Sequence, residues 1–180
     1  MLVQTRTRET INLKAQEVLR NYGNIVLPVK IEDIARSLSL KVIPYPFHED
    51  ISGTLIIEGN TGIIGYNQFE SRVRRRFTIA HELGHFILHK DRSAVFLDKQ
   101  FRVHFRSQNS KQSEDVQEME QEANAFAAAI LMPESLIKKQ LKDIDFDLGS
   151  EEATKYLARI FDVSSQAMSY RLAKLGLFDY

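Results

Sequence analysis

RVRRRFTIAHELGHFILHK, residues 72–90, is the stretch that decides how this chain of 180 residues folds. At its centre, His81, Glu82 and His85 form the pattern His-Glu-x-x-His. On an α-helix, positions four residues apart lie on one face, so both imidazoles can point at one metal ion. In the known use of this pattern the glutamate is not a ligand, and its carboxylate acts as general base on the water that the metal activates. We therefore predict a metal-binding helix with His81 and His85 as ligands and Glu82 as base.

The residues around this pattern predict a helix that is buried on nearly every side. They are apolar or small: Phe77, Ile79, Ala80, Leu83, Gly84, Phe86, Ile87 and Leu88. Two imidazoles and a carboxylate inside such a helix need a compensating partner, and a metal ion can provide it. The alternative is a pair of core histidines satisfied by hydrogen bonds, without a metal.

Composition limits both the ligands and the partners. Lys plus Arg and Asp plus Glu both number 24, so the net charge gives no general attraction to nucleic acid or to an anionic membrane. The chain has no cysteine, so a metal site must use His, Asp or Glu, which suits a reducing cytoplasm. No apolar run is long enough to span a bilayer, and the first residues lack the apolar core of a signal peptide. We expect a cytoplasmic protein with no membrane partner.

A second stretch, EDVQEMEQEANAFAAAILMP at residues 114–133, offers a third ligand. Catalytic zinc takes three protein ligands and leaves a fourth position open. One face of this predicted helix is apolar, and Glu120 borders that face, one turn before Asn124. Glu120 is therefore the expected ligand, Glu122 on the other edge is the alternative, and Asn124 can orient a metal-bound histidine. An acidic helix flank with solvated carboxylates is the interpretation without a metal.

The expected cofactor is Zn²⁺, with Mn²⁺ as a second candidate for a site of two histidines and one carboxylate. His89 is a tempting further ligand because it follows His85 by one turn. Three ligands along one straight helix would span about 12 Å, which is too far for bonds to one ion. We place His89 beside the ligands or at the helix end.

The rest of the chain predicts an α+β fold, in which a small antiparallel sheet packs on helices. Helical periodicity covers residues 7–22, 31–40 and 133–142, and β-rich segments cover 41–45, 53–58 and 62–66. Residues 91–114 have no clear period and are longer than an ordinary connection, so they are expected to border the cleft. A short strand at 101–105 would present His104, which could stabilise an oxyanion.

Two charged features outside the pattern also carry expectations. The basic cluster of Arg72, Arg74, Arg75 and Arg76 is expected to form salt bridges with acidic residues near 114–122, with a role in binding as the alternative. Residues 151–175 predict two helices joined by a tight turn at 162–164, as in a helix-turn-helix. Only Arg171 and Lys174 would give that unit a basic surface, so we assign it to packing or partner docking, with direct DNA binding through 151–175 as the alternative.

These features divide the chain into a zincin-like metallopeptidase domain at residues 1–145 and a helix-turn-helix-like extension at 146–180 that packs on it. The strings RRRFTIAHELGHFILH and EQEANAFAAAILMP resemble the two signature segments of the ImmA/IrrE family of bacterial and phage-associated metallopeptidases. The resemblance extends more loosely over residues 10–142. It implies a zinc-dependent, gluzincin-like metallo-endopeptidase, with His81, His85 and Glu120 as metal ligands, Glu82 as catalytic base and Asn124 as companion of the third ligand.

The resemblance also implies a substrate. It is a regulatory protein, often a helix-turn-helix transcriptional repressor encoded nearby, whose limited proteolysis derepresses genes of a mobile element or a stress response. The alternative function is a non-catalytic DNA- or protein-binding regulator with a structural metal site, which the C-terminal helix pair suggests. Glu82 favours the enzyme, because a structural metal site has no need of a base.

Overall fold

A computed structural model describes residues 7–99, 110–142 and 150–177. Within these ranges the chain forms seven helices and four strands, and none of these helices has the length and apolar character needed to cross a membrane. In order they are α1 (Arg8–Tyr22), α2 (Ile31–Ser37), β1 (Leu40–Tyr45), β2 (Ile51–Glu58), β3 (Thr61–Asn67), α3 (Arg72–His89), β4 (Val95–Lys99), α4 (Ser110–Leu131), α5 (Glu134–Leu141), α6 (Glu151–Phe161) and α7 (Ser165–Lys174). The predicted α+β class is confirmed.

The sheet has the strand order β1-β3-β2-β4 and is mixed. β2 and β3 form the predicted antiparallel hairpin, whose turn contains Gly59 at φ +62°. β1 pairs with β3 in parallel, which differs from the purely antiparallel sheet that we expected. The reason is that β3 inserts between the consecutive strands β1 and β2. The side-chain amide of Asn67 holds the connection between those strands by donating to the carbonyl oxygens of Phe47, His48 and Ile51.

β4 is an edge strand in a stretch that was expected to be irregular. It pairs antiparallel with β2, with Phe96 opposite Leu55, and both side chains are buried under the helices. On the other face of the strand, Val95 and Leu97 are exposed. The predicted strand at 101–105 and His104 lie outside the described residues.

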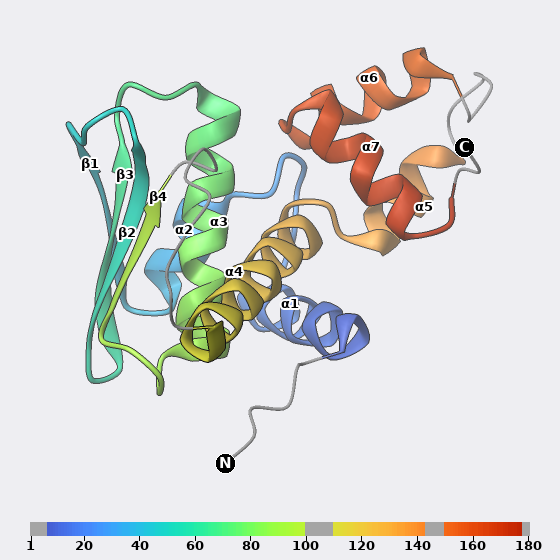
Figure 1. Ribbon diagram of the computed structural model, residues 1–180. Helices are drawn as coiled ribbons and strands as arrows, with labels where there is room; N and C mark the ends of the chain where they lie inside the picture. The colour runs from blue at the N-terminus through green and yellow to red at the C-terminus, as the bar shows by residue number, and fades with distance from the viewer. Residues whose placement is uncertain (1–6, 100–109, 143–149, 178–180) are drawn as a thin grey trace.

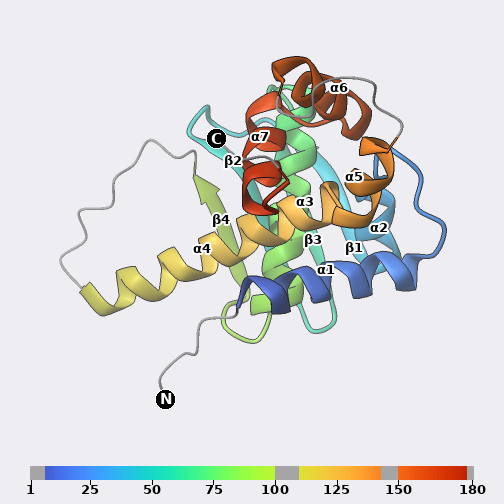
Figure 2. The ribbon, with the colours of Figure 1, turned by 90° about the vertical axis from the view of Figure 1, so that its right-hand side faces the viewer.

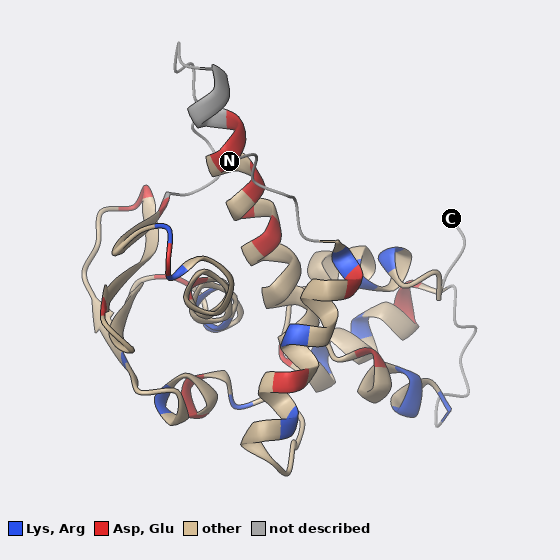
Figure 3. Cartoon of the chain, turned by 90° about the horizontal axis from the view of Figure 1, so that it is seen from below, with Lys and Arg blue, Asp and Glu red and all other residues tan. Residues whose placement is uncertain are grey.

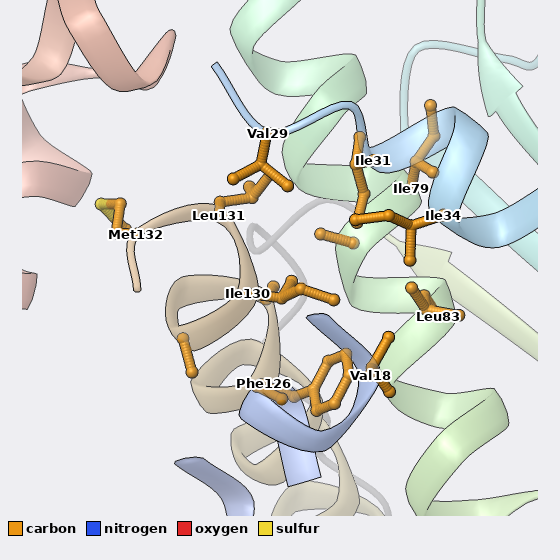
Figure 4. Packing of buried hydrophobic residues seen from close by; sticks show 14 of the residues in the cluster. Val18, Val29, Ile31, Ile34, Ile79, Leu83, Phe126, Ile130, Leu131 and Met132 are labelled. Atoms are coloured by element: carbon orange, nitrogen blue, oxygen red, sulfur yellow. The ribbon is translucent and has the colours of Figure 1, made fainter. Parts of the chain in front are cut away.

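All the described helices lie on one side of the sheet, and α3 is the layer next to it (Figure 1). α4 and α1 cross α3 on the side away from the sheet, in front of α3 in Figure 2, and the N-terminal part of α4 extends past the rest of the molecule. Apolar side chains from four helices meet in one cluster between these layers (Figure 4). Its labelled members are Val18, Val29, Ile31, Ile34, Ile79, Leu83, Phe126, Ile130, Leu131 and Met132. This cluster fixes α3 and α4 relative to each other.

Two glycines allow close approach to α3 on opposite sides. A Cβ atom at Gly84 of α3 would lie 3.1 Å from both the Cα and the carbonyl oxygen of Ala123 on α4. A Cβ atom at Gly53 of β2 would overlap the methyl group of Thr78 and lie 3.2 Å from Oε1 of Glu82. α3 is therefore held tightly between α4 and the sheet, as a site built from both helices requires.

The predicted C-terminal helix pair is present, with Ser150 and Ser164 as side-chain N-caps of α6 and α7. Asp162, which ends α6 in the left-handed conformation at φ 54°, accepts charged contacts from Arg72 at 2.8 Å and Arg76 at 3.1 Å. The expected pairing of this basic cluster with residues 114–122 is wrong for these two arginines. Their carboxylate partner comes from the helix pair, 86 residues or more further along the chain.

Arg171 of α7 also differs from expectation. We expected it to be exposed, but it is only 7% exposed. Its Nε donates to the carbonyl oxygen of Met132 and its Nη1 donates to Oδ1 of Asn12. Arg171 therefore attaches α7 to the rest of the chain and is not available to a phosphate backbone.

Candidate metal centre

The predicted ligands converge where α3 faces α4. Ser71 caps the N-terminus of α3 by accepting from the backbone N–H of Arg74, and the helix then runs unbroken through both histidines. Nε2 of His81 lies 3.2 Å from Oε2 of Glu120, and Nε2 of His85 lies 3.2 Å from Oε1 of the same carboxylate. The two Nε2 atoms are 3.0 Å apart. One carboxylate of α4 thus faces two ring nitrogens of α3.

These separations suit a single metal ion. The candidate ligand atoms of His81, His85 and Glu120 all lie within 4.8 Å of one another. Ligands at about 2.0–2.2 Å from a tetrahedral zinc ion lie about 3.3–3.6 Å from one another, and the observed contacts are slightly shorter. Two imidazole nitrogens and a carboxylate oxygen are also the donor types of catalytic zinc sites. The donor set therefore fits zinc.

α4 supports both histidines at their second ring nitrogens. Nδ1 of His81 lies 3.0 Å from Oδ1 of Asn124, the contact that the sequence led us to expect of this amide. Nδ1 of His85 lies 3.1 Å from Nδ1 of His89, whose Nε2 lies 2.9 Å from Oε2 of Glu122. The structure thus places Glu120 at the converging atoms and Glu122, the alternative ligand, behind His89. His89 lies beside a predicted ligand, as expected.

β4 covers the site from the sheet side. The ring of Phe96 stacks on the imidazole of His85, with centroids 4.5 Å apart and planes 19° from parallel. His81 and His85 have side-chain exposures of 3% and 2%, whereas the Glu120 side chain is 37% exposed. The site is therefore closed around the histidines and accessible from the side of Glu120.

The electrostatics of the converging groups are strongly coupled. Burial lowers the pKa of His81, but the hydrogen bond to Glu120 and the charges of Glu82 and Asp98 outweigh burial and raise this pKa to about 9. Burial raises the pKa of Glu120, but the hydrogen bonds from His81 and His85 outweigh it and hold this pKa well below its usual range. For His85, burial dominates and lowers the pKa. The ionised carboxylate of Glu120 and the protonated form of His81 therefore stabilise each other.

Glu82 differs from every other charged group of the site. It is completely buried, and neither of its carboxylate oxygens has a hydrogen-bond partner among the described residues. Burial raises its pKa well above the usual value, against the opposing influence of His81. A buried carboxylate without a donor is costly, so it indicates a group that contacts a ligand, a water molecule or an ion.

Sequence reasoning missed Asp98 of β4. Its carboxylate lies 3.8 Å from Nη2 of Arg74, and burial raises its pKa while the charges of His81 and Arg74 lower it. Arg74 also donates to Oγ of Ser52 at 2.9 Å. In the structure Val95 and Leu97 are exposed and Phe96 is buried, which places Asp98 on the same face as Phe96, but the sequence VFLDK has no alternation of apolar and polar residues that could have shown this.

Comparison with known proteins identifies the family of the chain. The model of the family described as Peptidase_M78, IrrE N-terminal-like domain, matches residues 35–173. The chain belongs to this family. It is a family of metallopeptidases, so the predicted membership is confirmed, and the three converging residues are a group that could hold the metal.

Individual proteins are also similar to the chain. "Uncharacterized immunity region protein 2" of Bacillus phage phi105 is 29% identical over 116 residues, which cover 64% of this chain and 66% of that protein. The solved structure of a "Mycobacterium tuberculosis transcriptional regulator" aligns with a TM-score of 0.58 at 16% identity, over 92% of this chain and 46% of that chain. This chain therefore spans about half of that regulator, and the likeness between the two concerns the fold.

Proposed function

We propose that this chain is a zinc-dependent metallo-endopeptidase that cleaves a regulatory protein. The observation that carries the proposal is Glu82, a fully buried carboxylate without a hydrogen-bond partner among the described residues, next to the converging donor atoms. A structural metal site needs its ligands and their supports, but it has no use for a further carboxylate of this kind. A catalytic site needs one as general base.

His81, His85 and Glu120 would hold the metal. When bound, a zinc ion supplies Lewis-acid polarisation of a peptide carbonyl and lowers the pKa of a water molecule to near neutrality. Manganese is the second candidate, but two nitrogen donors in a zincin-like arrangement favour zinc. Asn124 orients His81 through the contact at Nδ1, and Phe96 excludes solvent from one face of His85.

Glu82 performs the proton transfers in this proposal. Its carboxylate accepts a proton from the attacking water and delivers that proton to the nitrogen of the leaving amine. Burial strengthens it as a base, because removal from water raises its pKa. Gly53 contributes by its lack of a side chain, which leaves Oε1 of Glu82 room beside β2.

The proposed substrate is a helix-turn-helix repressor, whose cleavage would derepress mobile-element or stress-response genes. Support comes from the family and from the phage relative, whose name refers to an immunity region. The Glu120 side of the site is the accessible one, so a substrate segment would enter there.

The test uses the zinc-loaded protein and a helix-turn-helix repressor encoded beside it. We expect wild type to produce a single new N-terminus in the repressor, detected by mass spectrometry, and Glu82→Gln to produce none. A cell-wide search for new N-termini, comparing wild type with Glu82→Gln, extends the test to other substrates. If neither comparison yields a cleaved protein while zinc is bound, the peptidase function is wrong.

A non-catalytic regulator is the alternative, favoured by the helix pair α6 and α7. DNA recognition through this pair would rely on exposed cations of α7, yet Arg171 is buried and bonded to the carbonyl oxygen of Met132. We therefore propose that residues 146–180 are an extension that packs on the peptidase domain at 1–145. A sequence-specific gel shift by the purified protein would favour the alternative.

A further inference from the structure

The two histidines of the site are supported in different ways. His81 contacts a neutral amide, Asn124, directly from α4. His85 contacts a second imidazole, His89, which in turn contacts the carboxylate of Glu122. His85, His89 and Glu122 are all buried, with exposures of 1%, 1% and 6%. A buried chain of three polar groups ending in a carboxylate is more than two helices need in order to pack.

The positions of the protons follow from the donor and acceptor types. An ionised carboxylate only accepts, so Nε2 of His89 carries the proton in its 2.9 Å contact with Glu122. A neutral His89 then has a lone pair at Nδ1. The Nδ1 atoms of His89 and His85 are 3.1 Å apart and can bond only if one of them donates, so His85 donates. This leaves the lone pair of His85 on Nε2, the atom that faces Glu120.

We propose that His89 and Glu122 are positioning residues that fix the tautomer and the ring orientation of His85. The proposal rests on the proposed function, in which Nε2 of His85 binds the metal. Glu122 fixes the tautomer of His89 by accepting its Nε2–H, and His89 fixes the tautomer of His85 by accepting its Nδ1–H. Phe96 complements this relay by stacking on the ring of His85, so the hydrogen bond fixes rotation within the plane that the stacking defines. The relay also increases the basicity of His85, because its donated hydrogen bond leads to a carboxylate.

The relay explains the spacing of polar residues on α4. Glu120, Glu122 and Asn124 follow at intervals of two, so they leave the helix in different directions. Glu120 reaches the converging nitrogens, Asn124 reaches Nδ1 of His81, and Glu122 reaches His89, which contacts Nδ1 of His85. One helix thus supplies the third ligand and the support of both histidines.

The first test measures zinc affinity by competition with a chelator of known affinity. Glu122→Ala removes the acceptor, and we expect it to weaken zinc binding by about 10–100-fold. Glu122→Gln keeps a carbonyl oxygen that can accept from His89, so it should retain most of the affinity. Glu118→Gln, one turn earlier on α4, removes a carboxylate outside the relay and is the matched control, expected to leave affinity within about twofold of wild type. Thermal unfolding of each metal-free variant identifies any that fail to fold.

The second test reads the tautomers directly. In the ¹⁵N-labelled, metal-free protein, ring nitrogen shifts should show the proton of His89 on Nε2 and that of His85 on Nδ1. In Glu122→Ala, His89 loses the acceptor that fixes its tautomer, so the rings of His89 and His85 should both show mixed tautomers. The tautomer of His81, which contacts Asn124, should not change. A hydrogen bond that merely joins two helices would leave the His85 tautomer unaltered. If Glu122→Ala does not fold, the double variant His89→Phe, Glu122→Leu removes both groups of the relay, so neither is left without the other; the Nδ1–H of His85 then loses its acceptor, and the same loss of zinc affinity is expected.

The outcomes separate this proposal from the function on which it rests. Opposite tautomers in wild type, or full zinc affinity in a folded Glu122→Ala variant, overturn the relay even if the enzyme cleaves its substrate. A protein that cuts nothing but shows the expected tautomers and affinities keeps the relay and loses the peptidase function. A wild type without zinc affinity overturns the function, and the tautomers then decide the relay alone.

Discussion

The two ends of α3 use their polar side chains for different purposes. The C-terminal half, from His81 to His89, is buried, and its polar groups contact α4 or lie beside those that do. The N-terminal turns carry arginines that are partly exposed, and Arg72 and Arg76 contact Asp162 at the turn between α6 and α7. Figure 3 shows acidic residues recurring along α4, yet these two arginines pair elsewhere.

The two ends of α3 therefore differ in role: the C-terminal half carries the candidate metal site, and the N-terminal turns connect α3 to the helix pair α6 and α7. The buried end contains groups whose burial is expensive unless a ligand compensates them, so it is the functional part. At the other end, Asp162 pairs with the exposed Arg72 and with the partly buried Arg76, and these ion pairs connect the helix pair to α3. Substitutions at the first end should therefore change metal binding and catalysis, and those at the second end should change stability alone.

Glu82→Gln should have the largest effect. Gln has nearly the same volume but cannot accept a proton from water, so we expect cleavage to fall by about 10³-fold or more. Zinc content should remain near that of wild type, because Glu82 is not among the converging ligand atoms. The measurements are elemental analysis and the rate of repressor cleavage. A Gln variant that cleaves as fast as wild type would remove Glu82 from its role as base.

Glu120→Gln should have the next largest effect, on zinc binding itself. An amide is a far weaker zinc ligand than a carboxylate, and we expect affinity to fall by about 100-fold or more. Glu122→Gln is the matched comparison, since it changes the same atoms two residues away and should cost less than about tenfold. If Glu122→Gln abolishes zinc binding and Glu120→Gln does not, the ligand assignment is reversed.

Gly84→Ala tests how closely the two ligand-bearing helices must approach. Helix propensity favours Ala by about 1 kcal/mol, but the added methyl group would meet backbone atoms of Ala123 at 3.1 Å. Backbone cannot give way as a side chain can, and overpacking costs about 1–3 kcal/mol, so a net loss of stability is expected. Because Glu120 is on the displaced helix, zinc affinity should fall as well.

Gly59→Ala is the control for Gly84→Ala. It places the same methyl group at the hairpin turn, where nothing lies within 4 Å but φ is +62°. Backbone strain should lower stability by about 1 kcal/mol and leave zinc affinity unchanged. Chemical denaturation measures the stability of both variants, and competition with a chelator measures their zinc affinity. Equal zinc affinity in Gly84→Ala and Gly59→Ala would show that the spacing of α3 and α4 does not limit the site.

The sequence predicted local features of the molecule well and distant pairings poorly. The periodicity of residues 7–22 and the turn between 58 and 62 depend on neighbours in the chain, and both elements appear as expected. The insertion of β3 beside β1 depends on how the hairpin docks, which no local pattern encodes. β4 was missed because its five residues, VFLDK, show no alternation of apolar and polar side chains within a long stretch without a clear period.

The candidate site shows the same division. His81, Glu82 and His85 lie four residues apart or less, so helical geometry brings them together without knowledge of the fold. The sequence alone did not decide whether Glu120 or Glu122 is the third ligand, because the choice depends on which edge of α4 faces α3. In the structure, Glu122 contacts His89. Arg72 and Asp162 are 90 residues apart, and charge alone favoured the wrong acidic segment.

Asp162 gives the smallest effect and tests the other end of α3. Its carboxylate binds Arg72 and Arg76, and its backbone is left-handed at φ 54°. Asp162→Gly removes both ion pairs, but glycine readily adopts this left-handed backbone. We therefore expect the free energy of unfolding to fall by about 0.5–1 kcal/mol, and by less in high salt. Asp162→Ala removes the same pairs and adds backbone strain of about 1 kcal/mol, which salt does not change. Zinc affinity should stay within about twofold of wild type in both variants, because Asp162 contacts only the N-terminal turns among the α3 residues described here. A folded Asp162→Gly variant with weakened zinc binding would contradict the separation of the two ends, and would mean that the helix pair helps to hold α3 in register with Glu120.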